Sequence, residues 1–455
     1  MKVLLIYPNI VESPKDISFG LAIISSLLKK NNHKVKLIDT SFEKPNIAKI
    51  MQDYDPEFVG VSAASNDLSN AINICKEIKK IKNIPIICGG YHATIAPEDI
   101  LKEDCFDASA IGEAELSFLE LVNQFEKTKE LDKTLLNFHF KNKKNEISNL
   151  NQDLDALPFA DREIFDYQRY INHNRGLATF ITSKGCPYVC SYCINKVLMD
   201  KYKNKGKFLR FRSIDNVLKE IKEVILKYKV KEIEFYDDTF TLDKKRIKEF
   251  SQKYPLEIGL PFYINARVNA VAKEDFVLLK KAGCVRVSIG IESGDPEIRN
   301  NVLKRNQTDD QIINTFKWAK EAGLQTYSFN MIGIPQETKE SINKTIKLNE
   351  IIQPDFVGVS IFNAFKGTEL FNYCQENNLL RKENSKSYFQ SSNVIHPLFS
   401  MQELKKMRDS FGFKVYKKTR TKRAYIDLID KKFARYKLYN QLRSFLIERG
   451  IKKII

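Results

Sequence analysis

The sequence alternates short runs of apolar residues with longer amphipathic segments. In the first part of the chain we expect strands at 3–7, 35–39, 58–62, 84–88 and 108–111 and helices at 18–30, 67–81 and 113–125. Continuous apolar runs indicate strands buried on both faces, and the amphipathic segments between them indicate helices that cover those faces. The pattern therefore predicts an α/β fold with a doubly wound parallel sheet, which holds ligands at the carboxyl ends of its strands.

A second alternation follows a less regular stretch, in which 135–141 is a predicted strand. Its predicted strands are 178–183, 231–236, 262–265, 285–289, 326–331 and 356–360, with helices at 215–228, 244–251, 273–282, 308–322 and 339–352. Six strand–helix repeats predict a partial (β/α)6 barrel. Gly283 and Gly323 stand where two of these helices must stop, as expected for glycine after a helix C-terminus.

The 455 residues allow two or three domains. We expect a Rossmann-like domain over 1–140, a linker over 141–175 that contains Pro158, a partial barrel over 176–375 and a basic, mostly helical extension over 376–455. No run of about 20 uncharged apolar residues is present, so no membrane-spanning helix is expected. The first apolar run is too short for a signal peptide, and Pro8 ends it. A cytoplasmic location is the resulting expectation.

Three of the eight cysteines fall on one loop after the first barrel strand. Cys186, Cys190 and Cys193 have the spacing Cys-x3-Cys-x2-Cys. A zinc site usually needs a fourth ligand that is absent nearby, and a redox pair would leave Cys186 unexplained. Three thiolates on one loop suit a cubane cluster with one iron left open for a chelating ligand. Cys88 and Cys284 lie in apolar runs and are predicted to be buried as small hydrophobic residues.

The segment from Thr182 to Cys193, with the aromatic Tyr192 before its last cysteine, resembles the signature of radical S-adenosylmethionine enzymes. The resemblance covers most of residues 1–375. It implies that the three cysteines hold a 4Fe–4S cluster whose open iron is chelated by S-adenosylmethionine. It further implies reductive cleavage to a 5′-deoxyadenosyl radical that abstracts hydrogen from the substrate, and an external reductant such as flavodoxin or ferredoxin.

The resemblance also implies contacts to S-adenosylmethionine, mostly at the carboxyl ends of barrel strands. The candidate residues are Tyr192, Tyr236, Asp238, Arg267, Glu292 and Gly333. The carboxylate of Asp238, with Asp237 as second choice, suits the amino group, because a carboxylate accepts well from an ammonium. Glu292 can accept from hydroxyls, and Arg267 could reach a carboxylate or the substrate. Beyond the cluster cysteines no catalytic residue is predicted.

The segments 56–62, 88–94 and 110–115 resemble the cobalamin-binding domain of cobalamin-dependent radical S-adenosylmethionine enzymes, which include class B methyltransferases and anaerobic cyclases. The implied cobalamin contacts are Asn9, Ser62, Gly89, Gly90, His92, Gly112 and Glu113. The Asp-x-His-x-x-Gly motif that supplies a cobalt ligand in many cobalamin proteins is absent, so we expect no histidine on cobalt, His92 being the one candidate. A domain kept only for structure is the alternative.

The net charge of +17 is concentrated at the C-terminus. Residues 402–455 contain 17 Lys and Arg against 5 Asp and Glu, a net +12 that leaves +5 for the rest of the chain. This tail could be a helical appendage that packs its aromatic residues on the barrel, a contact with an anionic membrane surface, or an RNA-binding segment. We favour the membrane over nucleic acid, because no RNA-binding module is recognisable. That contact would make the protein peripheral to the membrane.

The sequence thus predicts a cobalamin-dependent radical S-adenosylmethionine enzyme that methylates an unactivated carbon of a small molecule, such as a lipid or tetrapyrrole. One alternative is an oxidative cyclase or rearrangement enzyme with the same cofactors. An alternative of another class is a non-catalytic corrinoid- or cluster-binding sensor. A single cluster is expected, because Cys75, Cys88 and Cys105 share no ligand spacing.

Overall fold

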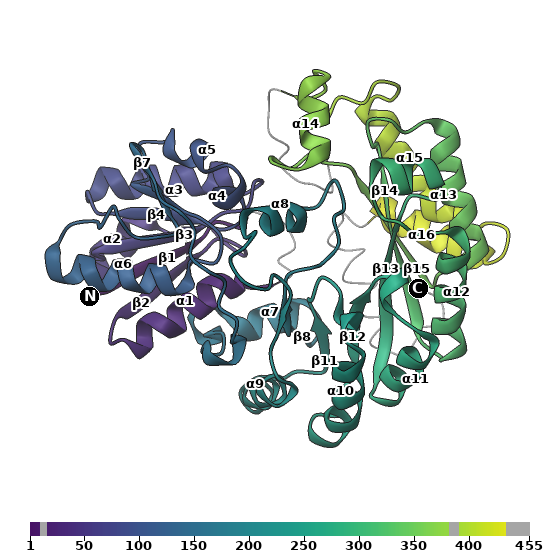
Figure 1. Ribbon diagram of the computed structural model, residues 1–455, viewed down its shortest axis with the longest axis horizontal. Helices are drawn as coiled ribbons and strands as arrows, with labels where there is room; N and C mark the ends of the chain where they lie inside the picture. Colours follow the sequence, from purple (N-terminus) through teal and green to yellow (C-terminus); the bar gives the residue numbers. More distant parts are fainter. Residues whose placement is uncertain (10–15, 382–390, 434–455) are drawn as a thin grey trace. The chain divides into compact units, whose positions relative to one another are not determined.

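The computed structural model describes residues 1–9, 16–381 and 391–433 (Figure 1). The chain forms two compact units. Unit 1 consists of Met1–Pro187 and Ile194–Asp237, and unit 2 of Tyr188–Cys193 and Asp238–Ile455. Cys186 therefore belongs to unit 1, and Cys190 and Cys193 belong to unit 2. The four domain ranges expected from the sequence differ from this division and stay predictions.

Unit 1 begins with a seven-stranded sheet in the order β2-β1-β3-β4-β5-β6-β7. The strands are β1 (Lys2–Tyr7), β2 (Lys34–Asp39), β3 (Phe58–Ser62), β4 (Ile86–Gly89), β5 (Ala108–Ala110), β6 (Phe138–Phe140) and β7 (Lys143–Lys144). The first five are parallel, and β6 and β7 add an antiparallel edge. The doubly wound sheet is confirmed, and the antiparallel hairpin at its edge was not predicted.

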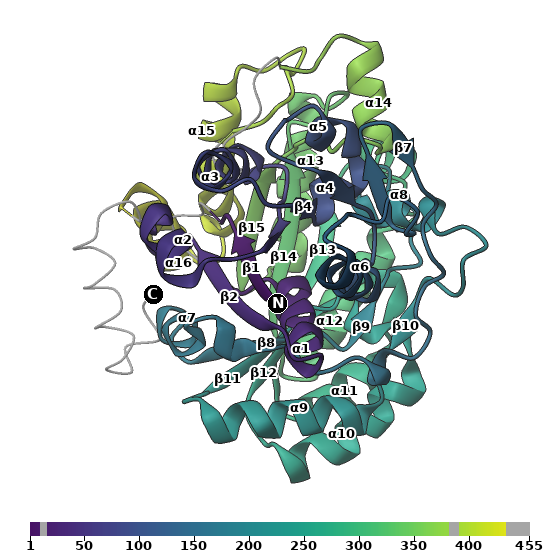
Figure 2. The ribbon, with the colours of Figure 1, turned by 90° about the vertical axis from the view of Figure 1, so that its left-hand side faces the viewer.

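Helices cover both faces of this sheet (Figures 1 and 2). They are α1 (Phe19–Lys30), α2 (Ile47–Tyr54), α3 (Leu68–Ile81), α4 (Tyr91–Ile95), α5 (Pro97–Leu101) and α6 (Glu115–Thr128). On one face Leu4 and Ile6 join a buried core with residues of α2 and α3. On the other face Leu5 and Gly60 turn towards α1 and α6, which lie side by side.

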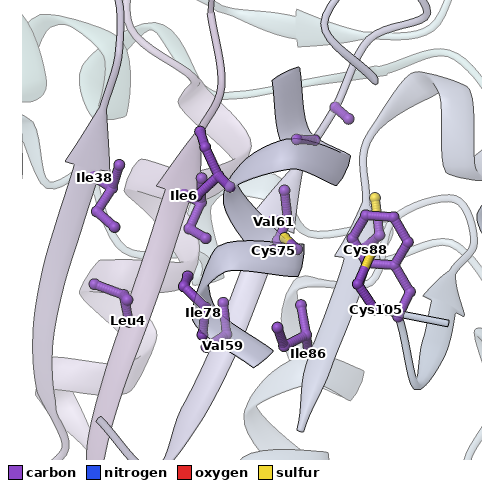
Figure 3. Close-up of a cluster of buried hydrophobic side chains, with 14 of the residues drawn as sticks. Leu4, Ile6, Ile38, Val59, Val61, Cys75, Ile78, Ile86, Cys88 and Cys105 are labelled. Atoms are coloured by element: carbon purple, nitrogen blue, oxygen red, sulfur yellow. The ribbon is translucent and has the colours of Figure 1, made fainter. Parts of the chain in front are cut away.

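The core beneath α3 contains three cysteines (Figure 3). Cys75, Cys88 and Cys105 are at most 3% exposed among Ile, Val and Leu side chains. Burial raises the pKa of the Cys105 thiol to about 11, and it also raises the pKa values of the Cys75 and Cys88 thiols. Cys284 in unit 2 is likewise buried. These thiols behave as small hydrophobic residues, as predicted for Cys88 and Cys284.

The second sheet is a six-stranded parallel half-barrel in the order β15-β14-β13-β12-β11-β8. Its strands are β8 (Leu177–Phe180), β11 (Glu232–Phe235), β12 (Phe262–Ala266), β13 (Cys284–Glu292), β14 (Gln325–Ile332) and β15 (Phe356–Ile361). A short antiparallel pair, β9 (Ser183–Lys184) and β10 (Arg210–Phe211), stands apart. The predicted partial (β/α)6 barrel is confirmed.

One helix, α7 (Tyr167–His173), precedes the first half-barrel strand, and further helices follow the strands. These are α8 (Ile194–Lys201), α9 (Ile214–Lys227), α10 (Lys244–Glu257), α11 (Lys273–Lys281), α12 (Asp309–Glu321) and α13 (Lys339–Ile352). α10 extends past the predicted residue 251 and includes Pro255, because Phe250 and Tyr254 pack their rings on Phe262 of β12. Gly283 and Gly323 adopt positive φ after α11 and α12, as predicted.

The C-terminal segment packs against β14 and β15 as far as the structure describes it. Its helices are α14 (Glu369–Glu376), α15 (Met401–Tyr416) and α16 (Thr421–Phe433). Phe411, Val415 and Ala424 are buried in one cluster with Ile332 and Ile361 of the strands. A bridge between Leu380 and Val394 lies within the extension that was expected to be mostly helical. The remainder of the basic tail, 434–455, lies outside the described residues. In the described ranges 1–9, 16–381 and 391–433, each helix is too short or too polar to cross a bilayer.

Candidate active site

The second half of the cysteine motif is anchored within unit 2 by hydrogen bonds from its backbone and side chains. The N–H of Cys193 donates to the carbonyl of Cys190 at 3.1 Å, which closes a tight turn. Ser191 donates from its N–H to the carbonyl of Leu303 at 3.2 Å and from its hydroxyl to that of Val302 at 2.5 Å. The turn is therefore fixed on the segment that follows β13.

Arg305, which the sequence analysis missed, ties this loop to the carboxyl end of β13. Its Nη1 donates to the hydroxyl of Tyr192 at 2.7 Å, and its Nη2 donates to the carbonyl of Gly290 at 2.6 Å. Nη1 also lies 3.5 Å from Oε1 of Glu292. The arginine is 5% exposed. Because it comes from a loop rather than a strand end, no signal in the sequence pattern singled it out.

Arg267 follows β12 and reaches the cysteine loop from another direction. Its Nη1 lies 3.4 Å from Sγ of Cys190, and its guanidinium stacks over the ring of Tyr188 at 3.8 Å. Nη2 donates to the carbonyl of Arg305 at 2.6 Å. The structure therefore brings four candidate residues together in unit 2: Cys190, Tyr192, Arg267 and Glu292.

Glu292 ends β13 in an unusual backbone conformation. Its φ is +65°, and the strand register shifts between Gly290 and Glu292. Burial raises the pKa of its carboxyl, although Arg305 and Arg267 oppose that shift. A non-glycine residue held at positive φ is typical of functional sites, where the surrounding structure supports the strain. The carboxylate is placed to accept hydrogen bonds at a strand end.

Gly333 follows β14, and its amide is already used. Its N–H donates to Oε2 of Glu337 at 2.7 Å, and the N–H of Ile334 donates to the same oxygen at 3.4 Å. Gly333 has φ +78°, which suits glycine. Glu337 is fully buried, and this burial raises its pKa to about 8. Glu337 thus shapes the turn that contains Gly333, whose role as a cofactor contact stays a prediction.

The two acids after β11 differ in burial. Asp237 is 1% exposed and accepts from the N–H and hydroxyl of Thr182, at 3.1 and 3.0 Å, and from the hydroxyl of Ser183. Asp238 is exposed. Asp237 therefore supports the strand end that leads to the cysteine motif, and Asp238 is the one of the two acids that solvent reaches. Tyr236, between β11 and these acids, is half-buried.

The donor set of the cysteine motif fits a cluster better than a single ion. Cys190 is buried and Cys186 and Cys193 are partly exposed, all three as free thiols. Among the residues that the structure describes, no three His, Cys, Asp or Glu side chains converge on one point where a metal ion could sit. A 4Fe–4S cluster offers each cysteine a different iron, so its ligands need not converge. The residues present therefore fit the cluster.

A cavity of about 120 Å³ lies between the N-terminal sheet and helices α1 and α6. Four of the predicted cobalamin contacts line it: Ser62, Gly89, Gly90 and Gly112. A Cβ on Gly60, deeper in the cavity, would lie 2.6 Å from the Phe118 ring. A Cβ on Gly90 would lie 2.8 Å from the carbonyl of Ala63. Glycine at these two positions therefore allows close packing of neighbouring protein atoms. The cavity itself lies at the carboxyl ends of the strands, where folds of this kind bind ligands.

Three further cobalamin candidates already have partners: Glu113, Asn9 and His92. The Glu113 carboxylate accepts from Arg210 and lies 3.3 Å from Nζ of Lys184, and its N–H donates to the Tyr202 hydroxyl at 2.6 Å. The pairs with Lys184 and Arg210 were not predicted. As a result α6 begins at Glu115 rather than at Glu113.

Asn9 and His92 take part in local hydrogen bonds. Asn9 donates to Ser41 at 3.0 Å. Nδ1 of His92 lies 2.9 Å from the Ser65 hydroxyl, and Nε2 lies 3.4 Å from Asp99. Both ring nitrogens of His92 therefore lie near polar groups of the same unit. The roles of these residues towards cobalamin stay predictions.

Comparison with known families matches both parts of the chain. The model of the Radical SAM superfamily matches residues 180–348, and that of the B12 binding domain matches residues 16–122. The B12 binding match covers strands of the N-terminal sheet, and the Radical SAM match covers strands of the half-barrel. A 4Fe–4S cluster, S-adenosylmethionine and cobalamin are the cofactors that these two domains use together.

Full-length relatives agree with this assignment. The chain is 31% identical to an uncharacterized methyltransferase of Pyrococcus horikoshii over 100% of its own length and 98% of the relative. It is 24% identical to the anaerobic magnesium-protoporphyrin IX monomethyl ester cyclase of Rubrivivax gelatinosus, over 82% of this chain and 69% of the cyclase. The chain therefore belongs to the B12-binding radical SAM enzymes, a family related to class B methyltransferases and anaerobic cyclases.

A solved structure shares the fold over almost the whole chain. The cobalamin-dependent S-adenosylmethionine radical enzyme OxsB, solved with aqua-cobalamin and S-adenosylmethionine, has a TM-score of 0.74 and 17% identity. The match covers 99% of this chain and 75% of OxsB. At this identity the likeness concerns the fold alone.

Proposed function

We propose that the protein methylates an unactivated carbon of a small-molecule substrate. The similarity to the Pyrococcus methyltransferase supports this proposal, because the two chains match over almost their entire lengths. The cyclase is less similar and extends beyond the matched region. When bound, the cluster and S-adenosylmethionine supply hydrogen abstraction, and cobalamin carries the methyl group.

The residues of the half-barrel would hold the first two cofactors. Cys186, Cys190 and Cys193 are the proposed cluster ligands. Asp238 would accept from the amino group of S-adenosylmethionine, and Glu292 from its hydroxyls. Tyr192, Tyr236 and Gly333 are proposed as further contacts. Arg305 would have a positioning role, because it holds Tyr192 in place. Asp237 would likewise hold the chain that follows β8.

The cavity of unit 1 would hold part of cobalamin. Ser62, Gly89, Gly90 and Gly112 lie at its lining and would contact the ligand through backbone and small side-chain groups. Asn9, His92 and Glu113 would maintain the loops around them, because their side chains already bind neighbouring residues. A cavity that backbone atoms can approach closely supports cobalamin binding over retention for structure alone.

The test is anaerobic reconstitution with iron, sulfide and hydroxocobalamin, followed by dithionite, methyl-deuterated S-adenosylmethionine and a small-molecule extract. Methyl transfer should give a product that carries the deuterated methyl group, together with S-adenosylhomocysteine and 5′-deoxyadenosine. An oxidative cyclase would give 5′-deoxyadenosine without S-adenosylhomocysteine. If 5′-deoxyadenosine does not exceed that of a Cys186→Ala control, the protein is not a radical enzyme and the sensor alternative gains support.

We propose flavodoxin or ferredoxin as the reductant and an anionic membrane surface as the partner of the basic tail. Within the described part of the tail, α16 leaves Tyr425, Leu428, Ile429 and Phe433 between 38% and 55% exposed. These residues follow one another at helical spacing, so they share one side of the helix. An apolar stripe in a basic segment is typical of a helix that lies on a membrane. A hydrophobic substrate would suit that location.

A further inference from the structure

Arg267 is a buried cation whose positive charge needs a counterpart. It is 6% exposed. Within the part of the chain that the structure describes, no carboxylate lies within ion-pair distance of its guanidinium; its neighbours are the carbonyl of Arg305, the amide oxygen of Asn269, the Tyr188 ring and Sγ of Cys190. The carboxyl of Glu292 interacts with this charge only from beyond ion-pair distance, and a buried charge without a close opposite charge is unfavourable. Among the direct neighbours, Sγ of Cys190 belongs to a proposed cluster ligand.

Three contacts hold the guanidinium of Arg267 in place, and they orient it towards the sulfur of Cys190. Nη2 donates to the carbonyl of Arg305 at 2.6 Å and Nε to Oδ1 of Asn269 at 2.9 Å. Its plane lies over the Tyr188 ring at 3.8 Å. The remaining Nη1 is directed at Sγ of Cys190 at 3.4 Å, within the range of a hydrogen bond to sulfur. Because the planar guanidinium is pre-organised, less side-chain entropy is lost for each hydrogen bond that it forms.

We propose that Arg267 is a positioning residue that raises the reduction potential of the cluster through this hydrogen bond. The proposal rests on the proposed role of Cys190 as a cluster ligand. One electron from the external reductant enters without a bond being made or broken, so the cluster and its thiolates gain one negative charge. A cationic donor to a ligand sulfur stabilises the more negative state. Hydrogen bonds to the sulfurs are among the determinants of such potentials.

Arg267 would thus act on the potential of the cluster, whereas the sequence suggested a contact with S-adenosylmethionine. Arg305 provides a matched comparison, because it is equally buried in the same unit but donates to the Tyr192 hydroxyl and the Gly290 carbonyl. Removal of either arginine deletes one positive charge near the cysteine loop. Only removal of Arg267 deletes the hydrogen bond to sulfur.

The experiment uses the full-length, reconstituted enzyme and its Arg267→Met, Arg267→Lys and Arg305→Met variants. Iron and sulfide per chain are measured first. The midpoint potential is then obtained by redox titration monitored by electron paramagnetic resonance, without S-adenosylmethionine. We expect a tenfold loss of electron affinity in Arg267→Met, which for one electron is a downward shift of about 59 mV. Arg267→Lys should shift less because it retains a cationic donor, and Arg305→Met should shift less than Arg267→Met.

An unchanged potential in Arg267→Met, or an equal shift in Arg305→Met, would overturn the proposal. If Arg267→Met fails to assemble a cluster, Arg267→Lys decides by the same measurement. If neither Arg267 variant binds iron while Arg305→Met does, Arg267 serves assembly of the loop, and the proposal is also wrong. Failure of the underlying ligand assignment would look different, because a Cys190→Ala variant would then keep its full iron content.

Discussion

The guanidinium of Arg305 donates to the hydroxyl of Tyr192 at 2.7 Å and to the carbonyl of Gly290 at 2.6 Å. One buried side chain thus joins the residue between two cysteines of the motif to the carboxyl end of β13. The position of the cysteine loop in unit 2 therefore depends on a contact between residues 113 positions apart in sequence.

Tyr192→Phe is expected to lower the stability of the protein while keeping the aromatic ring. Loss of the hydroxyl leaves a donor of Arg305 without its partner in a buried place, which costs about 1–3 kcal/mol. Thermal unfolding of the apoprotein should show a lower Tm. Tyr373→Phe is the control, because Tyr373 packs in the same cluster and its hydroxyl donates to no described residue. An equal Tm for the two variants would contradict the role given to Arg305.

Asp237→Asn and Asp238→Asn should have different consequences. Asp237 is buried and accepts from Thr182 and Ser183, so its substitution should lower Tm. Asp238 is exposed, so its substitution should lower Tm less than that of Asp237 and raise the Kd for S-adenosylmethionine about tenfold, the effect of losing one charge-assisted hydrogen bond. Calorimetric titration with S-adenosylmethionine under anaerobic conditions measures the second effect. The reverse pattern would assign the ligand contact to Asp237.

Glu337 should make stability fall as pH rises. Burial raises the pKa of this carboxyl to about 8, against an ordinary value of 4.5. Between these values the folded chain binds a proton that the unfolded chain has released, so each step up in pH disfavours the folded state. Glu337→Gln, which stays neutral, should therefore match the parent protein near pH 4.5 and have the higher Tm at pH 8.

The control for this pH dependence is Glu340→Gln. Glu340 lies in the first turn of α13 and is exposed. Its substitution should leave the slope of Tm against pH as it is in the parent protein. Thermal unfolding of the apoprotein at several pH values measures both variants. A parallel pair of curves for Glu337→Gln and the parent would show that Glu337 is ionised in the folded state.

Gly60→Val should reduce cobalamin binding without loss of the cluster. Its Cβ would lie 2.6 Å from the Phe118 ring and 3.0 Å from Leu5, so the added side chain would occupy the cavity. Overpacking of this kind costs about 1–3 kcal/mol, which a folded protein can tolerate. The ultraviolet–visible spectrum after incubation with hydroxocobalamin gives the bound amount, and iron content provides the control. Full cobalamin occupancy would exclude this cavity as the binding site.

Deletion of 434–455 should weaken binding to anionic vesicles. The deleted segment has six Lys and Arg against one Glu, and each basic residue near such a surface contributes about 1 kcal/mol. Removal of the whole tail from 402 would be uninformative, because Phe411, Val415 and Tyr416 belong to a buried core. Co-sedimentation with anionic and with neutral vesicles measures the effect. Equal binding of the full and shortened chains to anionic vesicles would rule out this partner.

The sequence predicted the parts of the fold that repeat. Buried parallel strands such as Phe58–Ser62 are continuous apolar runs, and the glycines at 283 and 323 mark helix ends by backbone conformation alone. Helix α2 escaped prediction because it has only eight residues, about two turns, and two turns are too few for a helical period to be recognised. Strand β6 lies within the strand predicted at 135–141, whereas β7 has only two residues, too few to show alternation.

The candidate site was predictable only where its residues stand at strand ends or on the cysteine loop. Asp237 and Asp238 are adjacent in sequence, and only burial distinguishes them. Arg305 comes from an irregular segment, and its importance arises from a distant residue that folding brings to it. Tertiary contacts of this kind leave no local pattern, so they require the structure.

Five of the eight cysteines are sealed in apolar cores, and the three of the motif are not all so protected. Since a thiol reacts only as its thiolate, alkylating reagents at neutral pH would select the partly exposed Cys186 and Cys193 of the apoprotein and spare Cys75, Cys88, Cys105, Cys284 and Cys374. The same difference in burial should protect the five buried thiols when the protein is exposed to oxygen. Oxygen should therefore damage the motif loop first, whose oxidised thiols must be reduced before iron and sulfide can rebuild a cluster, while the buried thiols of each unit should stay reduced.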